Sequence, residues 1–260
     1  MSGPGRSDMV RFDELQRVLR LAMELRELPR GSMQQRRHAL EGLRALVGAQ
    51  VALWAHVDGM LSGQVMIRNA LDLGFCGDGE RRMFLAYIED AQWTSLDPSM
   101  PRLARAVSSP VSTFTREQLL DGRDWYGSTH VQEFRRAARV DSFIYATYAP
   151  GGDESSSISL HRAWGERPFC ERERRIIDIF SRECTFLHEP RTDVDPTLCR
   201  GLAPRLQDTL RALARGQSEK QVAASLGLSP HTVHEYVKAL YRHFGVQSRS
   251  ELLAMCLAGG

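Results

Sequence analysis

Apolar residues near the start of the chain recur at helical spacing. The first stripe stops at Pro29 and comprises Phe12, Leu15, Val18, Leu19, Ala22 and Leu25. This spacing predicts one amphipathic helix. Ser32 and Gln35 form a capping-box signature that predicts a second helix, whose stripe is Leu40, Leu43, Leu46 and Val47. We expect both stripes to pack against the domain body, and a helix contact between two copies of the chain is the alternative.

After these helices the pattern changes to that of strands. Residues 50–59 and 63–75 predict a hairpin that turns around Gly59 to Gly63. Helical spacing returns between Glu80 and Trp93, with a buried side made of Met83, Phe84, Tyr87 and Ile88. Residues 94–114 contain three prolines and predict a loop with a short helix. Thr129 with Gln132 predicts the cap of another helix, running through Arg139.

Strands resume in the next segment. Residues 141–149 and 155–164 flank a turn at 150–153, and a final helix directs Ile176, Ile179, Phe180 and Phe186 toward the core. Hairpins make sequential strands antiparallel neighbours. The predicted fold class is therefore α+β, with an N-terminal α/β/α sandwich around a central antiparallel sheet, followed by an all-α domain. Residues 1–190 form the first domain, 191–199 a polar linker bounded by prolines, and 200–260 the second domain.

Residues 202–257 divide into four short helices. Pro204 suits a first helical position, and Gly216, Gly227 and Gly245 suit helix ends. Caps are expected at Ser218 with Gln221, at Ser229 before Pro230, and at Ser248 with Glu251. A helix, a tight turn containing glycine and a second helix are the elements of a helix-turn-helix, whose second helix enters the major groove of DNA.

The third of these helices has two distinct faces. Val233, Val237, Leu240 and Phe244 share one face and are expected to anchor it, while the other carries His231, His234, Glu235, Lys238 and Arg242. Residues 200–260 hold eight of the Lys and Arg residues and four of the Asp and Glu residues, a balance of +4 in a chain of net charge +2. A basic terminal module indicates a nucleic-acid partner, although a solvated helix face has the same appearance.

Residues 202–256 resemble the LuxR-type helix-turn-helix domain of bacterial transcription regulators. The matching motifs are Pro204-Arg205, Gly216-x-Ser218-x-Lys220-x-Val222-Ala223, Leu228-Ser229, Thr232-Val233, and Phe244-Gly245-Val246-x-x-Arg249-x-Glu251-Leu252. Ala203 and Leu206 depart from the family's usual hydroxyl and carboxylate, and His234 and Tyr236 stand where the family often has Lys and His. The resemblance implies a DNA-binding transcription regulator that acts as a homodimer.

The resemblance and helix geometry together assign roles on the DNA. The residues expected to read bases are His234, Glu235 and Lys238. Those expected to contact phosphates are Lys220, Ser229, Thr232, Arg242 and Arg249. RNA polymerase is a further candidate partner.

Residues 35–190 resemble, by the order of their elements, GAF and PAS ligand-sensing domains. Tyr87, Asp97-Pro98 and Pro110 add a looser similarity to the acyl-homoserine-lactone-binding domain of quorum-sensing regulators, but that family's cluster of Trp and Tyr residues is not found. We expect this domain to sense a small molecule and to control dimeric DNA binding. The aromatic residues expected to line its pocket are Trp54, Trp93, Trp125, Tyr126, Tyr145 and Trp164. A ligand-free dimerisation or protein-interaction module is the alternative.

Other mechanisms find little support in the sequence. Residues 1–199 contain no lysine and their strands come in hairpin-like pairs, which argues against a phosphoacceptor receiver domain, and no GxxxxGK[ST], GxSxG or HExxH motif occurs. Cys184 and His188 stand four apart as a possible metal pair, but no further ligand is apparent, so we expect no metal, no cofactor and no enzymatic activity. Five cysteines without a CxxC pair, with neither a signal peptide nor an apolar stretch of membrane length, predict a cytoplasmic protein with reduced thiols. The operator, the ligand and the sign of regulation stay open.

Overall fold

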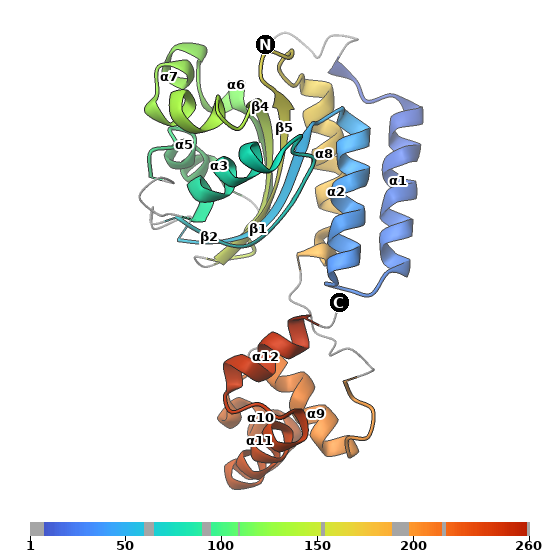
Figure 1. Cartoon of the computed structure of the whole chain (residues 1–260). Coiled ribbons are helices and arrows are strands. Elements are labelled where there is room, and N and C mark those ends of the chain that lie inside the picture. Colours follow the sequence, from blue (N-terminus) through green and yellow to red (C-terminus); the bar gives the residue numbers. More distant parts are fainter. Residues whose placement is uncertain are drawn as a thin grey trace. The chain divides into compact units, whose positions relative to one another are not determined.

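The computed structural model describes residues 8–59, 65–89, 95–108, 110–151, 154–188, 198–214 and 217–258. The chain divides into two compact units (Figure 1). The sheet unit consists of residues 1–27 and 36–188, and the helical unit of residues 28–35 and 189–260. No helix in the described ranges is long and apolar enough to cross a membrane.

A five-stranded antiparallel sheet forms the centre of the sheet unit. Its strands are β1 (Val51–Asp58), β2 (Met66–Leu73), β3 (Val111–Thr115), β4 (Val140–Tyr148) and β5 (Glu154–Ala163). They lie in the order β2-β1-β5-β4-β3. The β1–β2 and β4–β5 pairs confirm the two predicted hairpins, and β1 pairs with β5 to join them.

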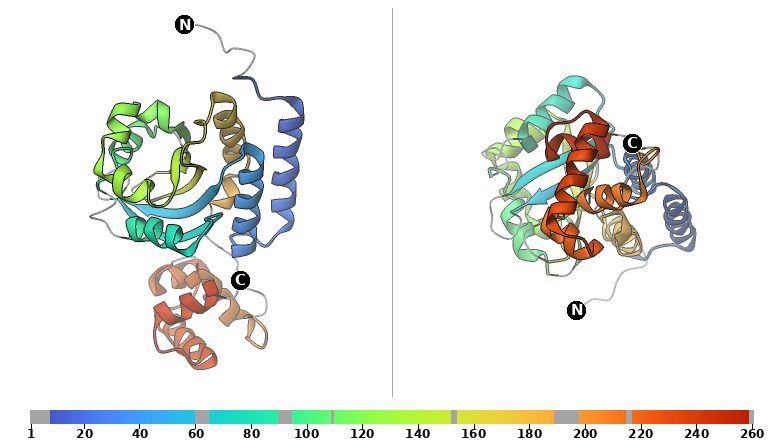
Figure 2. Two further views of the ribbon diagram at one scale, coloured as in Figure 1. Left: turned by 45° about the horizontal axis from the view of Figure 1, so that its top comes forward. Right: turned by 90° about the horizontal axis from the view of Figure 1, so that it is seen from below.

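Helices cover both faces of this sheet (Figure 2). On one side lie α1 (Phe12–Glu27), α2 (Met33–Val47) and α8 (Glu171–Glu183), followed by the short turn η3 (Thr185–Leu187). On the other lie α3 (Asp78–Glu89), α5 (Met100–Ala106), α6 (Arg116–Leu119) and α7 (Gly122–Tyr126). The fold class predicted for this part of the chain, an α/β/α sandwich with a central antiparallel sheet, is confirmed.

Four local predictions about helix surfaces and ends were wrong. Phe12 and Leu19 on α1 are 74% and 46% exposed, whereas Val18, Ala22 and Leu25 of the predicted stripe are buried, together with Leu21. Met83 on α3 is exposed as well. At the start of α2 the Gln35 amide N–H donates to Ser32 Oγ as expected, but the Gln35 side chain accepts from Gly31 rather than from Ser32.

The segment between α7 and β4 also differs from its prediction. The expected α-helix through Arg139 is replaced by the π-helical turn η2 (Val131–Arg135), and the Val131 amide donates to Ser128 Oγ rather than to Thr129. A π turn rotates the residues that follow it relative to a regular helix. A second departure is β3, which occupies part of a stretch expected to be loop and short helix.

The helical unit consists of α9 (Pro204–Ala214), α10 (Glu219–Leu226), α11 (Pro230–Phe244) and α12 (Arg249–Ala258). These are the four predicted helices. Gly227 and Gly245 end α10 and α11 in the left-handed conformation, with φ of 64° and 67°. The expected stop at Gly216 lies outside the described residues. The core of the unit joins all four helices through Leu210, Leu213, Val222, Val233, Val237, Leu240 and Leu252.

Candidate DNA-binding face and candidate ligand cavity

Both ends of α11 are fixed by local chemistry. Ser229 Oγ accepts a hydrogen bond from the Thr232 amide at 3.0 Å, and Pro230 takes the first helical position. At the other end the Gly245 amide donates to the Tyr241 carbonyl. Val233, Val237 and Leu240 are buried against the other helices of the unit. The opposite face of α11 is thereby held toward solvent.

The three residues predicted to read bases lie together on this exposed face. Lys238 Nζ donates to Glu235 Oε1 at 3.0 Å, and this hydrogen bond and charge lower the pKa of Glu235. His234 Nδ1 lies 3.1 Å from Glu219 Oε2, which connects α11 to α10. All three side chains are exposed. A base edge can therefore approach them, provided that it replaces these weak surface contacts.

The predicted phosphate contacts occupy more varied positions. Lys220 and Arg242 are exposed, and the hydroxyl groups of Ser229 and Thr232 lie 2.8 Å apart at the N-terminus of α11. Arg249 is partly buried, and its guanidinium donates to the Gln217 carbonyl at 2.8 Å. Arg249 therefore connects α12 to the segment before α10 through this hydrogen bond, in addition to the phosphate contact predicted for it.

Two capped helices around a tight turn, with the second helix exposing polar side chains, define a helix-turn-helix DNA-binding domain. Residues 200–256 match the family model described as "Bacterial regulatory proteins, luxR family". This part of the chain is thus a luxR-family domain, and the predicted resemblance is confirmed.

Comparison with whole proteins gave only remote likenesses. No curated protein matches the chain. Among solved structures, Escherichia coli SdiA is 10% identical with a TM-score of 0.44, and the match covers 94% of this chain and 98% of SdiA. The VqsR LBD domain from Pseudomonas aeruginosa is 11% identical with a TM-score of 0.45, covering 68% of this chain and 96% of that one. CepR2 from Burkholderia cenocepacia, described as an N-acylhomoserine lactone dependent LuxR family factor, is 12% identical with a TM-score of 0.43, covering 68% and 97%.

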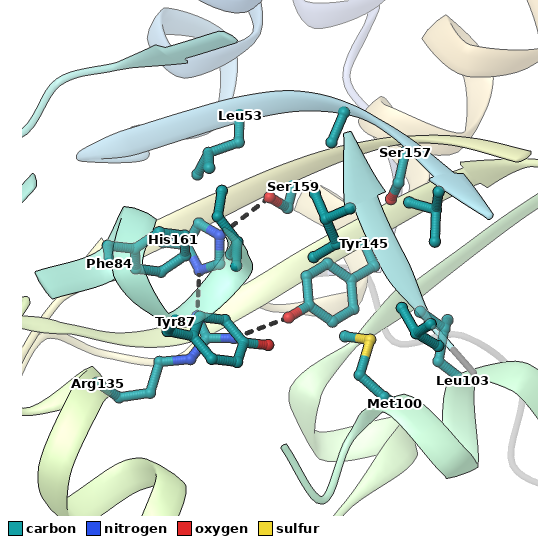
Figure 3. Close-up of a pocket in the computed structure, with 15 residues that line it drawn as sticks. Leu53, Phe84, Tyr87, Met100, Leu103, Arg135, Tyr145, Ser157, Ser159 and His161 are labelled. Atoms are coloured by element: carbon teal, nitrogen blue, oxygen red, sulfur yellow. Dashed lines mark hydrogen bonds between the residues drawn. The ribbon is translucent and has the colours of Figure 1, made fainter. Parts of the chain in front are cut away.

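The sheet unit contains a cavity on the face of the sheet that α3 and α5 cover (Figure 3). Its apolar wall comes from β1, the segment at β2, α3 and α5, namely Leu53, Ala55, Val57, Val65, Ile67, Phe84, Tyr87, Ile88, Met100 and Leu103. Its polar part comes from η2, β4 and β5, namely Arg135, Tyr145, Ser157, Ser159 and His161. An apolar cavity with a few convergent polar groups is the usual form of a small-molecule site.

Arg135 organises the polar end of the cavity although it is 1% exposed. Its Nε donates to His130 Nε2 at 3.0 Å and its Nη1 donates to His161 Nδ1 at 2.9 Å. Its Nη2 donates to Tyr145 Oη at 2.8 Å and to Asp97 Oδ2 at 3.2 Å. The guanidinium also lies within 6 Å of four aromatic ring centroids. The π turn η2 ends at Arg135, so this backbone irregularity accompanies the placement of the charge.

Asp97 supplies the counter-charge and is fully buried. Its Oδ1 accepts from the amide and the hydroxyl of Ser99, and its Oδ2 accepts from Tyr87 Oη at 2.7 Å as well as from Arg135. Burial alone would raise the pKa of Asp97, but His130, Arg135 and these hydrogen bonds lower it to about 2. Burial opposes the charge on Arg135, yet Tyr145 and Asp97 raise its pKa. The cluster therefore contains one cation and one anion at neutral pH.

The two histidines that contact Arg135 are neutral. Burial is the main cause that lowers the pKa of His130, to about 4, and Arg135 adds to the effect. Burial and then Arg135 also hold the pKa of His161 well below its usual value. Because arginine can only donate, Nδ1 of His161 is an acceptor and its hydrogen resides on Nε2, which lies 3.1 Å from Ser159 Oγ.

Of the aromatic residues predicted to line a pocket, Tyr145 lines this cavity. Trp54 lies on the opposite face of β1 and stacks on His188 with ring centroids 4.7 Å apart. Trp125 and Tyr126 instead donate to the two carboxylate oxygens of Asp141, and Trp164 contacts Tyr126 edge to face. Trp93 lies outside the described residues.

Apart from Tyr145, the polar residues of the cavity were not predicted from the sequence. Ser157, Ser159 and His161 alternate along β5 and share one face, so a period of two in this strand was the available signal. Arg135 gave no such signal, because its inward direction accompanies the π turn. The structure does not make a metal site of Cys184 and His188: His188 is held by Ser156, and no group of three metal-ligating side chains occurs in the part of the chain that is described.

Proposed function

We propose that this protein is a dimeric transcription regulator that binds specific DNA through its luxR-family domain and is controlled by a small molecule bound in the cavity of the sheet unit. His234, Glu235 and Lys238 read bases, and Lys220, Ser229, Thr232, Arg242 and Arg249 contact phosphates. The cavity is the observation that carries the sensory part of this proposal. A sheet unit that served only to dimerise the luxR-family domain would not need an apolar cavity with buried polar groups at one end.

The placement of the polar groups supports regulation from within the sheet unit. Tyr145, Ser159 and His161 lie on β4 and β5, two central strands that pair along most of their length. On the other face of these strands, Tyr148 stacks on His188 and Ser156 bonds to it. His188 immediately precedes residues 189–197, the segment of chain that leads to the luxR-family domain. A ligand that shifts β4 against β5 therefore acts on His188.

The proposal is tested by capture of sheared genomic DNA on the full-length protein at about 0.15 M salt, with and without the small-molecule fraction of a cell extract. Sequencing should recover a few promoter-proximal sites that share an inverted repeat, and the small-molecule fraction should change their yield. Recovery of the same sites at unchanged yield would favour the ligand-free alternative, in which the sheet unit only assembles the dimer. The exposed Phe12, Leu19 and Met23 on α1 favour that second function.

A further inference from the structure

The outer face of α1 carries a stripe of large apolar side chains. Phe12, Leu19 and Met23 are 74%, 46% and 68% exposed. With 3.6 residues per helical turn, these three positions fall within about 40° of one another around the helix axis. Single exposed apolar residues are normal on a protein surface, whereas a continuous row of them marks an interaction surface.

Contacts on the opposite side of α1 fix the direction of this stripe. Leu21 packs against Gly42 of α2 so closely that a Cβ atom at Gly42 would lie 2.5 Å from Leu21 Cδ1. Glu14 is buried, accepts from the Arg11 amide at 2.9 Å and lies 3.7 Å from Arg172 of α8. Figure 1 shows α1 at the outer edge of the sheet unit, with α2 and α8 between it and the sheet. The stripe is therefore held away from the core of this unit.

The charged residues beside the stripe are of both signs. Asp13 and Arg20 lie on the same flank of the stripe, about two helical turns apart. Asp13 lies 3.7 Å from both Arg11 and Arg17, and all three side chains are exposed, so these ion pairs are weak. Arg20 is exposed and forms no ion pair within the described part of the chain. The flank therefore offers one cation and one anion to a partner.

A second α1 helix in antiparallel orientation fits both the stripe and these charges. Two antiparallel helices related by a twofold axis bring the same flank of each together. Placing Phe12 level with Met23 of the second copy sets Leu19 level with its Gln16. The same register leaves Arg20 about 3 Å along the axis from Asp13 of the second copy, which long side chains can span. The twofold axis repeats each of these contacts.

Resting on the proposed function, we infer that two chains associate through an antiparallel contact between their α1 helices. Phe12, Leu19 and Met23 form the apolar centre of this contact, and Arg20 pairs with Asp13 of the second copy. The partner of the exposed stripe is thus the same stripe on another copy of this chain.

Sedimentation equilibrium of the full-length protein over a range of micromolar concentrations tests the apolar centre. Phe12→Glu and Leu19→Glu should each raise the dissociation constant of the dimer at least about tenfold, because each places a charge in an apolar contact. Met83→Glu is the matched control and should leave this constant unchanged, since Met83 is 39% exposed on α3, which covers the other face of the sheet. All three positions are exposed, so circular dichroism should show folded variants.

An exchange of charges tests the register. Asp13→Arg and Arg20→Asp should each weaken the dimer, and the double variant should restore it, because the exchanged charges again attract across an antiparallel contact. A double variant as weak as the single ones would overturn the antiparallel pairing.

Two further outcomes separate the contact from dimeric DNA binding itself. A dimer of unchanged affinity in Phe12→Glu and Leu19→Glu would overturn the α1 contact and leave the proposed dimeric regulator standing. An original chain that stays monomeric at every concentration and on DNA would instead refute the dimer of the proposed function. If Phe12→Glu alters DNA capture at unchanged mass, the stripe has another occupant and the inference fails.

Discussion

At the scale of single residues, the two lysines of the chain offer a matched test of DNA recognition. Lys238 lies on the outer face of α11 and Lys220 in the first turn of α10. Lys238→Ala should weaken binding to the specific site by about 1–3 kcal/mol and relax base preference, because a base contact is lost. Lys220→Ala should weaken binding to all sequences alike and lower the slope of log K against log salt by about one.

Fluorescence anisotropy with specific and scrambled duplexes at several salt concentrations measures both quantities. Unchanged base preference in Lys238→Ala would remove this residue from the reading set. A sequence-dependent loss in Lys220→Ala would instead move Lys220 into it.

A second prediction at this scale concerns His188, which stacks between Trp54 and Tyr148. Burial, with His56 and Arg36 nearby, lowers the pKa of His188 to about 3. Between pH 6.5 and 3 the unfolded chain therefore binds a proton that the folded protein does not, and stability falls as the pH falls. His188→Phe should remove this proton and reduce the pH dependence of the free energy of unfolding by about 1.4 kcal/mol per pH unit within that window.

Urea unfolding at several pH values, followed by tryptophan fluorescence, measures this dependence in the sheet unit, since all four tryptophans precede residue 189. His130 and His161 have lowered pKa values too, so part of the dependence should persist in the variant. An unchanged slope would mean that His188 carries a proton in the folded protein.

At the scale of elements, local signals predicted the helical unit better than the sheet unit. Caps such as Ser229 and end residues such as Gly245 act within a few positions of the chain, so their effect is readable without the fold. The strand β3 was missed because it follows Pro110 in a segment rich in prolines, and pairing with β4 decides its conformation. Phe12 and Leu19 were wrongly assigned to the buried stripe of α1 for a similar reason, because their exposure depends on where neighbouring helices lie.

A comparison of two serine caps can distinguish an effect on helix stability from an effect on DNA contact. Ser218 caps α10 and Ser229 caps α11, each accepting from an amide three residues ahead. Replacement of either by alanine should cost about 1 kcal/mol of helix stability, measured by circular dichroism during thermal unfolding. Only Ser229→Ala should also weaken DNA binding at temperatures where both variants are folded, because Ser229 is assigned a phosphate. Equal loss of binding in the two variants would attribute the effect of Ser229 to the cap alone.

At the scale of the whole molecule, the two candidate sites differ in how far the sequence could predict them. The three predicted base-reading residues lie on one helix, so their common face follows from spacing within 15 residues. The cavity unites β1, β2, β4, β5, α3, α5 and η2, which lie far apart in the chain. Aromatic residues were predicted to line it, but alternation on β1 turns Trp54 away and hydrogen bonds to Asp141 hold Trp125 and Tyr126 elsewhere.

If the protein binds DNA as a dimer, its affinity should depend on the spacing between the two half-sites. Two luxR-family domains related by a twofold axis reach half-sites on the same side of the duplex when the centres of the half-sites lie about 10 base pairs, or a multiple of that, apart. Insertion of about 5 base pairs at the centre of the inverted repeat should place the half-sites on opposite sides and abolish tight binding, whereas insertion of about 10 should restore part of it. Gel-shift titration of the full-length protein against the three duplexes measures the effect. A monomeric reader would bind all three duplexes alike, because each half-site alone would supply its whole contact surface.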